Sequence, residues 1–209
     1  SRTGDEISKS FPEIIEKITG DFVLDGELLA GIDNEPKTFN DLQQRLNKKS
    51  PTEKFIKTNP CFIKVYDVLF FNGIDLRDKP LIERKKVLNS YFSTNRSPLF
   101  LSETIKFKDW EFLDKVRDIS NKQLHEGVMI KSVLSLYIAG RPRGKWFKWK
   151  RNPKSVDAII MYAQRGHGKR SSFYSDYTFG VFNSEKELVP IGKAYSGFTD
   201  EELNRLDKF

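Results

Sequence analysis

The sequence has a single cysteine, Cys61, and only two histidines among its 209 residues. One cysteine excludes an intramolecular disulfide and a cysteine-rich zinc site. Neither His125 nor His167 has a second histidine or a cysteine at metal-ligand spacing, so neither is expected to bind a metal ion. No apolar run approaches the ~20 residues that a membrane-spanning helix needs. The low cysteine content also fits a reducing compartment.

Two familiar catalytic motifs are missing as well. The sequence contains no G-x-S-x-G segment, so serine hydrolase chemistry has no support. Residues 166–171 (G-H-G-K-R-S) resemble part of a phosphate-binding P-loop, but Ala163 occupies the position where that motif needs its first glycine. We expect a basic turn at this place instead.

The chain does contain enough apolar material for a core, together with many charges. Hydrophobic residues make up 38% of the sequence, charged residues 31% and aromatic residues 13%, including 17 phenylalanines. This balance excludes an intrinsically disordered tail and an integral membrane protein. The length allows either one large or two small domains.

Positive charge is concentrated in residues 141–170. The formal net charge is +7, but this window has ten basic side chains against one acid, so it carries +9 and the rest of the chain −2. Such a local field favours a polyanionic partner, with a solvated basic surface as the alternative. Lysines alternate here with aromatics, which predicts Lys148 and Lys150 on one strand face and Phe147 and Trp149 on the other.

The spacing of apolar residues predicts strands alternating with helices up to residue 151, and mostly strands after it. The expected strands cover residues 22–24, 28–30, 61–71, 127–133, 146–150, 157–162 and 177–182. The expected helices cover residues 39–46, 80–92 and 109–119, with a last one that begins at the capping box of Thr199 and Glu202. Asn152-Pro153 marks the change in pattern. We therefore predict an α+β domain at 1–151 and a β-rich domain at 152–209.

Three groups of charged residues have the composition of a functional site. Asp25-Gly26-Glu27 would place two carboxylates on one strand face, where they could hold Mg²⁺ or a ribose hydroxyl, but the triplet alone favours an acidic turn at a strand end. Glu126 leads into an apolar strand that ends in Lys131, which suits a metal ligand or equally a structural salt bridge. Lys148 and Lys150 repel each other unless an anion lies between them.

The order and spacing of these groups resemble the successive motifs of ATP-dependent DNA ligases. The segments that carry the resemblance are S-R-T-G-D (1–5), L-D-G-E-L (24–28), Y-D-V-L-F-F-N-G (66–73), E-G-V-M-I-K (126–131) and W-F-K-W-K (146–150). The tail from Ser155 looks most like a bacterial branch of that family. The resemblance implies a nucleotidyltransferase (adenylation) domain with antiparallel sheets and flanking helices, truncated at its N-terminus, followed by an OB-fold domain truncated at its C-terminus.

The resemblance also implies roles for individual residues. The implied AMP-binding set is Arg2, Asp25, Glu27, Tyr66, Met129, Lys148 and Lys150. In it, Arg2 and Glu27 bind the ribose, Tyr66 stacks on adenine, and the two lysines neutralise the α-phosphate. Glu27 and Glu126 are the implied ligands of Mg²⁺ or Mn²⁺. The implied DNA-binding residues are Arg141, Arg143, Lys145, Arg151, Arg165, Lys169 and Arg170.

The resemblance is incomplete at both ends. The family's nucleophile is the lysine of a Lys-x-Asp-Gly motif upstream of the S-R segment, and no such motif occurs here. The family's last basic motif in the OB-fold domain is missing too. We therefore expect the 209-residue chain to be unable to form lysyl-AMP by itself.

For the parent protein, the resemblance implies a monomeric enzyme of the bacterial cytoplasm that seals nicks in duplex DNA with ATP and Mg²⁺. Two alternatives remain open at this point. One is a non-catalytic nucleic-acid-binding module, and the other is an RNA ligase or capping-type nucleotidyltransferase.

Overall fold

The computed structural model describes residues 1, 3–119, 125–140, 142–153, 155–168 and 171–208. The chain divides into two compact units, Ser1–Arg151 and Asn152–Phe209. In the described ranges, no helix combines the length and the apolar character needed to cross a membrane.

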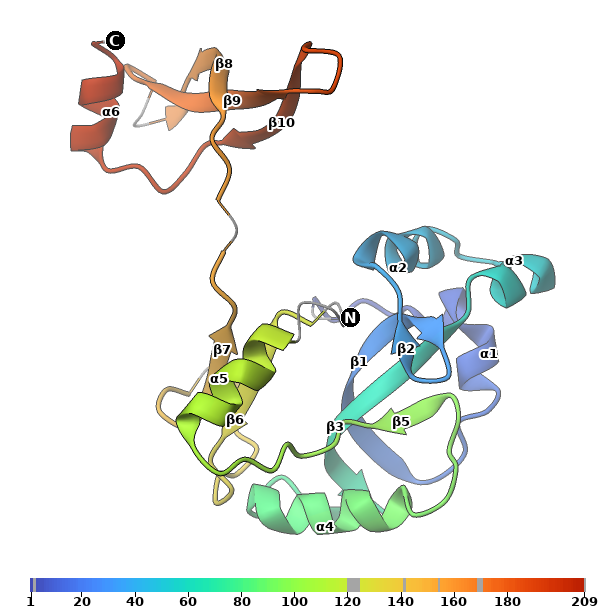
Figure 1. The fold of residues 1–209 in the computed structure, drawn as a ribbon. Coiled ribbons are helices and arrows are strands. Elements are labelled where there is room, and N and C mark those ends of the chain that lie inside the picture. The colour runs from blue at the N-terminus through green and yellow to red at the C-terminus, as the bar shows by residue number, and fades with distance from the viewer. Residues whose placement is uncertain (2, 120–124, 141, 154, 169–170, 209) are drawn as a thin grey trace. The chain divides into compact units, whose positions relative to one another are not determined.

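The first unit is built on a five-stranded sheet with two long central strands (Figure 1). The central strands β1 (Phe22–Ile32) and β3 (Cys61–Phe71) pair antiparallel over most of their length. The other strands are β2 (Glu35–Pro36) and β4 (Ile74–Asp75), both antiparallel to their neighbours, and β5 (Leu99–Leu101), parallel to β3. The chain turns after β3 at Asn72 and Gly73, which have φ angles of 48° and 81° that these residue types tolerate.

The first unit contains six short helices in its described residues. They are η1 (Ser8–Ser10), α1 (Pro12–Ile15), α2 (Phe39–Leu46), α3 (Glu53–Thr58), α4 (Leu81–Tyr91) and α5 (Trp110–Ile119). Of these, α2 packs on β1 and α4 on β3. Thr38 caps α2 as a capping box, in which its backbone N–H donates to Asp41 Oδ2 at 3.0 Å and its hydroxyl accepts from the Asp41 N–H. Leu42 of this helix is buried in the core, whereas Phe39 is 68% exposed.

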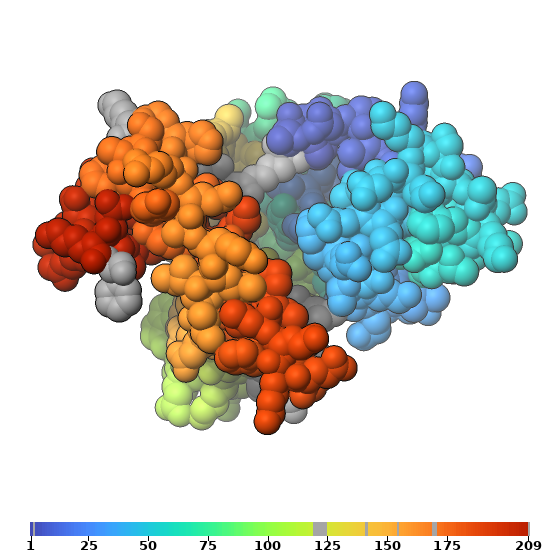
Figure 2. All heavy atoms as spheres, turned by 90° about the horizontal axis from the view of Figure 1, so that it is seen from above, coloured from blue at the N-terminus to red at the C-terminus, as the bar shows by residue number. Residues whose placement is uncertain are grey.

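Two hydrophobic clusters hold the first unit together. The cluster under α1 and α2 contains Phe11, Ile14, Ala30, Leu42 and Cys61. The cluster under α4 contains Val65, Val68, Leu76, Leu88 and Leu99. The fully buried Arg45 links three helices, because it donates to Glu13 of α1 at 2.8 Å and to the Asn59 carbonyl after α3 at 2.9 Å. Accordingly, α2 and α3 form one continuous blue-to-cyan lobe in the space-filling view (Figure 2).

The first unit also contains an antiparallel ribbon of two strands, β6 (Gly127–Lys131) and β7 (Trp146–Lys150). Helix α5 lies along this ribbon (Figure 1). The segment between the two strands reaches α4, where the Leu81 N–H donates to the Ser135 carbonyl at 2.9 Å and the Ile82 N–H donates to the Val133 carbonyl at 2.9 Å.

The second unit is a three-stranded antiparallel sheet with one helix. Its strands are β8 (Ile159–Arg165), β9 (Tyr174–Phe182) and β10 (Leu188–Ala194), with β9 in the centre. The expected capping box of Thr199 and Glu202 is confirmed at the start of α6 (Asp200–Leu206). Leu203 of this helix is fully buried, and the rings of Tyr177 and Phe198 pack with centroids 5.6 Å apart.

Candidate functional site

The Asp25-Gly26-Glu27 triplet lies in the middle of β1. The simplest interpretation of the triplet, an acidic turn at a strand end, is therefore wrong. A Cβ on Gly26 would lie 2.9 Å from the Lys64 carbonyl oxygen of β3, so only glycine lets the two strands approach this closely. Asp25 and Glu27 are two residues apart in a strand, which places both carboxylates on one face of the sheet.

Tyr66 occupies a β-bulge in β3. Asp25 pairs with Asp67 and Gly26 pairs with Val65, so Tyr66 has no partner of its own on β1. Bulges re-aim a side chain and are common beside functional sites. The Tyr66 hydroxyl donates a 2.9 Å hydrogen bond to Asp25 Oδ1. Burial, reinforced by the negative charge of Asp25, raises the pKa of Tyr66 and keeps the phenol protonated as a donor.

One face of the β6–β7 ribbon carries lysine, methionine and tryptophan side chains. The strand register pairs Met129 with Lys148 and Lys131 with Trp146. Lys150 follows Lys148 by two residues, so it shares that face. The predicted alignment of the two lysines on one side of a strand is therefore confirmed.

The opposite face of the ribbon packs against α5. Trp149 meets Trp110 with ring centroids 6.1 Å apart, and the guanidinium carbon of Arg117 lies 4.8 Å from the Trp149 ring centre. Trp149 is partly buried on this face, while Phe147 is 54% exposed. The packing on α5 fixes which way the lysine face of the ribbon points.

Lys131 joins the ribbon to the bulge on β3. Its Nζ lies 4.6 Å from the centre of the Tyr66 ring and 4.0 Å from the centre of the Trp146 ring, which are cation–π distances. Burial lowers the pKa of Lys131, and the charges of Asp67 and Asp25 act in the opposite direction. The ammonium group therefore covers one face of the Tyr66 ring.

Glu126, the second predicted metal ligand, forms an ion pair at the other end of the ribbon. Its Oε2 lies 2.9 Å from Lys150 Nζ, and both side chains are exposed. The hydrogen bond and charge of Lys150 lower the pKa of Glu126, with a smaller effect from Lys148. Carboxylate oxygens suit Mg²⁺, but no three His, Cys, Asp or Glu side chains gather as metal ligands in the described ranges. Glu27 and Glu126 thus offer suitable oxygens without a preassembled metal cage.

The structure links most of the predicted nucleotide-binding residues through the ribbon. Glu27 is exposed on β1, on the same face as Asp25, whose carboxylate accepts the hydrogen bond from Tyr66. Tyr66 meets the ribbon at Lys131, and Lys148 lies further along the same face. Within the described ranges, no hydrogen bond or ion pair joins Glu27 directly to Lys148 or Lys150.

The predicted DNA-binding residues are spread over both units. Arg143 and Lys145 are exposed between β6 and β7, and Arg151 follows β7 in a partly buried position. Arg165 is exposed at the end of β8, with its guanidinium carbon 5.4 Å from the Tyr174 ring centre. Four predicted site residues lie outside the described residues: Arg2, Arg141, Lys169 and Arg170.

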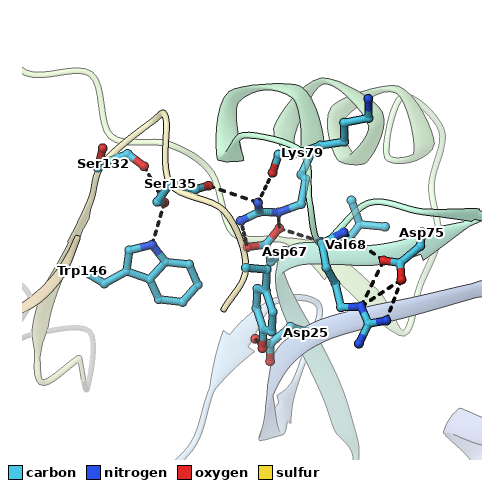
Figure 3. Close-up of polar contacts among 11 residues, drawn as sticks. Asp25, Asp67, Val68, Asp75, Lys79, Ser132, Ser135 and Trp146 are labelled. Atoms are coloured by element: carbon cyan, nitrogen blue, oxygen red, sulfur yellow. Dashed lines mark hydrogen bonds and ion pairs between the residues drawn. The ribbon is translucent and has the colours of Figure 1, made fainter. Parts of the chain in front are cut away.

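Sequence reasoning missed a buried polar network behind Tyr66 (Figure 3). Arg84 of α4 and Asp67 of β3 are both fully buried and form two hydrogen bonds, Nε to Oδ1 at 2.8 Å and Nη2 to Oδ2 at 2.9 Å. Arg84 Nη1 also donates to the Ser135 carbonyl at 3.2 Å, and Trp146 Nε1 donates to the Ser135 hydroxyl at 2.8 Å. The network therefore ties β3, α4 and the ribbon together.

Tyr137 extends this network to β1. Its hydroxyl donates a 2.8 Å hydrogen bond to Asp25 Oδ2, and its ring lies 5.7 Å from the guanidinium carbon of Arg84. Burial raises the pKa of Tyr137 to about 12, helped by the hydrogen bond to Asp25. One sequence signal could have found Arg84: it lies between Leu81 and Leu88 on the apolar face of α4, where a charge needs a partner. We find no such signal for Tyr137.

Comparison with known protein families matches residues 1–150 to the "ATP dependent DNA ligase domain". The chain belongs to the ATP-dependent DNA ligase family. The "Probable DNA ligase" of Koribacter versatilis (strain Ellin345) is 34% identical over 234 residues, which cover 100% of this chain and 40% of that protein. The "DNA ligase" of Methanococcus aeolicus is 30% identical over 99% of this chain and 38% of its own length. The chain thus spans about two-fifths of these relatives.

A solved ligase has the same fold. The crystal structure of the ligase domain from M. tuberculosis LigD superposes with a TM-score of 0.56 at 22% identity, over 100% of this chain and 63% of that chain. The expected mixed α+β adenylation-domain fold of DNA ligases is therefore confirmed. The similar ligases come from bacteria and archaea alike, so the family does not single out the bacterial branch that the tail suggested.

Proposed function

We propose that this chain belongs to a DNA ligase that uses ATP to seal nicks in duplex DNA. The observation that carries the proposal is the cationic face of the ribbon beside Tyr66, in a member of this family. Lys148 and Lys150 share one face of β7, and Lys150 already pairs with the Glu126 carboxylate, which supports anion binding on this face. The Tyr66 ring offers a surface on which a base can stack. A phosphate site next to a stacking surface suits a nucleotide.

In this proposal, adenine stacks on the face of Tyr66 that Lys131 leaves open, next to Met129 on the ribbon. Arg2 and Glu27 bind the ribose, and Asp25 supports them. Lys148 and Lys150 contact the α-phosphate. Glu27 and Glu126 would hold Mg²⁺, which when bound supplies positive charge to the phosphate oxygens.

The reaction in the parent protein would have three steps. A lysine amine outside these 209 residues attacks the α-phosphorus, a P–N bond forms, and pyrophosphate leaves. A 5′-phosphate oxygen at the nick then takes over the adenylate and releases the lysine. Finally, the 3′-hydroxyl attacks the 5′-phosphate, loses its proton and displaces AMP. Lys148 and Lys150 stabilise the negative charge that grows on the phosphoryl oxygens.

The second unit and a set of basic residues would bind the DNA backbone. We propose that this unit is part of an OB-fold domain, and its three antiparallel strands support that assignment. The basic set comprises Arg141, Arg143, Lys145, Arg151, Arg165, Lys169 and Arg170. Contacts to phosphates predict sequence-independent binding whose log K falls with log salt at a slope of about −0.9 per phosphate.

The test measures transfer of label from α-labelled ATP to protein and then to nicked DNA. In the full-length protein, Lys148→Ala should lower the rate of lysyl-AMP formation strongly, whereas the exposed Lys193→Ala on β10 should not. The 209-residue chain alone should take up no covalent label. Equal rates for the two variants would contradict the phosphate role, and labelling of the chain alone would contradict a nucleophile outside it. Sealing of nicked RNA in preference to nicked DNA would contradict the substrate.

A further inference from the structure

Asp25 has both carboxylate oxygens occupied by phenols from two different elements. Tyr66 of β3 donates to Oδ1 at 2.9 Å, and Tyr137 of the β6–β7 connection donates to Oδ2 at 2.8 Å. Hydrogen bonds to an ionised acceptor are about twice as strong as neutral ones. Asp25 therefore serves as an acceptor that joins three segments, β1, β3 and the β6–β7 connection.

Tyr137 is itself held in place by several contacts. Its backbone N–H donates to the Arg77 carbonyl at 2.9 Å. Its ring packs edge-on against Trp146, with centroids 5.8 Å apart, and also contacts the guanidinium of Arg84. A phenol fixed at its backbone and on its ring directs its hydroxyl at one acceptor position.

These contacts form a closed loop of residues. Tyr66 binds Asp25, Asp25 binds Tyr137, Tyr137 lies against Arg84, and Arg84 forms a buried ion pair with Asp67, the neighbour of Tyr66 in β3. Asp67 and Arg84 are fully buried and the other members are partly buried, and breaking a contact in such a set leaves a polar group without its partner. The closed loop of contacts therefore holds the Tyr66 side chain at its hydroxyl and fixes its orientation.

We propose that Asp25 and Tyr137 are positioning residues that lock the Tyr66 ring as a preorganised stacking platform for the base of the nucleotide. This inference rests on the proposed function, since it assigns the base to Tyr66. A phenylalanine at this position would keep the stacking face but lose the lock, because it has no hydroxyl for Asp25 to accept from. The lock reduces the side-chain entropy lost when a base stacks, which is the usual benefit of preorganisation.

The test uses two variants that each remove a single oxygen, Tyr66→Phe and Tyr137→Phe, in the 209-residue chain. Binding of ATP and of inorganic tripolyphosphate is measured by calorimetry. Each variant should weaken ATP binding about 2- to 10-fold, the effect expected from one additional side chain to immobilise. Tripolyphosphate binding should not change, because it uses the lysines alone. The exposed Tyr162→Phe in β8 is the matched control and should leave both affinities unchanged.

The results that would contradict the lock differ from the result that would contradict the proposed function. Equal ATP affinity in Tyr66→Phe and in the unsubstituted chain would overturn the lock while leaving the proposed function intact. Equal losses for ATP and tripolyphosphate would also overturn it, because they would indicate a general structural defect. The stability costs of the two variants should not add in the double variant, since both phenols bind one carboxylate; additive costs would contradict the lock. An unsubstituted chain that binds neither ligand would refute the proposed function, and the lock's role with it.

Discussion

The ion pair between Asp67 and Arg84 should be the most sensitive polar contact in the first unit. Both side chains are fully excluded from solvent, and they share two hydrogen bonds of 2.8 and 2.9 Å. In addition, Asp67 Oδ1 accepts from the backbone N–H of Val68 at 2.9 Å. The substitution Asp67→Asn keeps the shape of the side chain and removes the negative charge.

The expected cost follows from the buried charge that remains. Asp67→Asn leaves the Arg84 guanidinium without a counter-ion in the interior, and breaking a buried pair in this way costs about 3–5 kcal/mol. The chain offers a matched comparison in the ion pair of Asp75 and Arg77, whose side chains are 47% and 61% exposed. Asp75→Asn should cost no more than about 1 kcal/mol, because water and salt screen exposed pairs.

Urea unfolding followed by tryptophan fluorescence measures both costs. Trp110, Trp146 and Trp149, the three tryptophans of the chain, all belong to the first unit, so the signal reports that unit. Asp67→Asn should shift the midpoint several times further than Asp75→Asn. Replacing both members of the buried pair, as Asp67→Leu with Arg84→Met, should recover much of the loss. Similar shifts for Asp67→Asn and Asp75→Asn would refute the assignment of a buried, mutually dependent pair.

Two further perturbations test local geometry. Gly127→Ala should disrupt the β6–β7 ribbon, because Gly127 has a φ of 143° and the new Cβ would clash with the Trp149 carbonyl oxygen. Circular dichroism and the melting temperature measure the effect. Gly144→Ala is the control, because Gly144 also has a positive φ but has open space where the Cβ would lie. For pH, the folded-state pKa of Tyr137 is raised from 10.0 to about 12, so its contribution to stability is present below pH 10 and is lost as the pH rises through about 12. The free energy of unfolding should therefore fall less steeply between these values in Tyr137→Phe than in the unsubstituted protein, and identical slopes would argue against the shift.

Much of the fold was accessible from local sequence signals. Apolar spacing predicts the helix at 39–46, and α2 has these bounds with Thr38 as N-cap. The alternation of lysine and tryptophan in β7 correctly predicted its two faces. The strand around Asp25-Gly26-Glu27 was harder, because two acids and a glycine are typical of a turn. The close approach of β3 at Gly26, which requires a strand here, is a tertiary contact that local signals do not contain.

The candidate site, like the fold, combines features that local sequence signals predict with features that depend on tertiary contacts. The residue types of the candidate site followed from the motifs, but the support around Tyr66 depends on contacts between distant segments. Asp25 and Tyr137 are 112 residues apart, and Arg84 and Ser135 are 51 apart. Neither pair leaves a periodic signal. The bulge that sets Tyr66 out of register also depends on pairing with β1, so the hydrogen bond from Tyr66 to Asp25 could not be read from the sequence.

A titration of the 209-residue chain with ATP, followed by NMR, tests the central claim most directly. The claim is that one nucleotide contacts Tyr66 with its base and Lys148 and Lys150 with its phosphate. ATP should therefore perturb the ring signals of Tyr66 and the side-chain signals of both lysines with a single dissociation constant. Perturbation of the lysines without Tyr66, or different constants for the two ends, would contradict a shared nucleotide site.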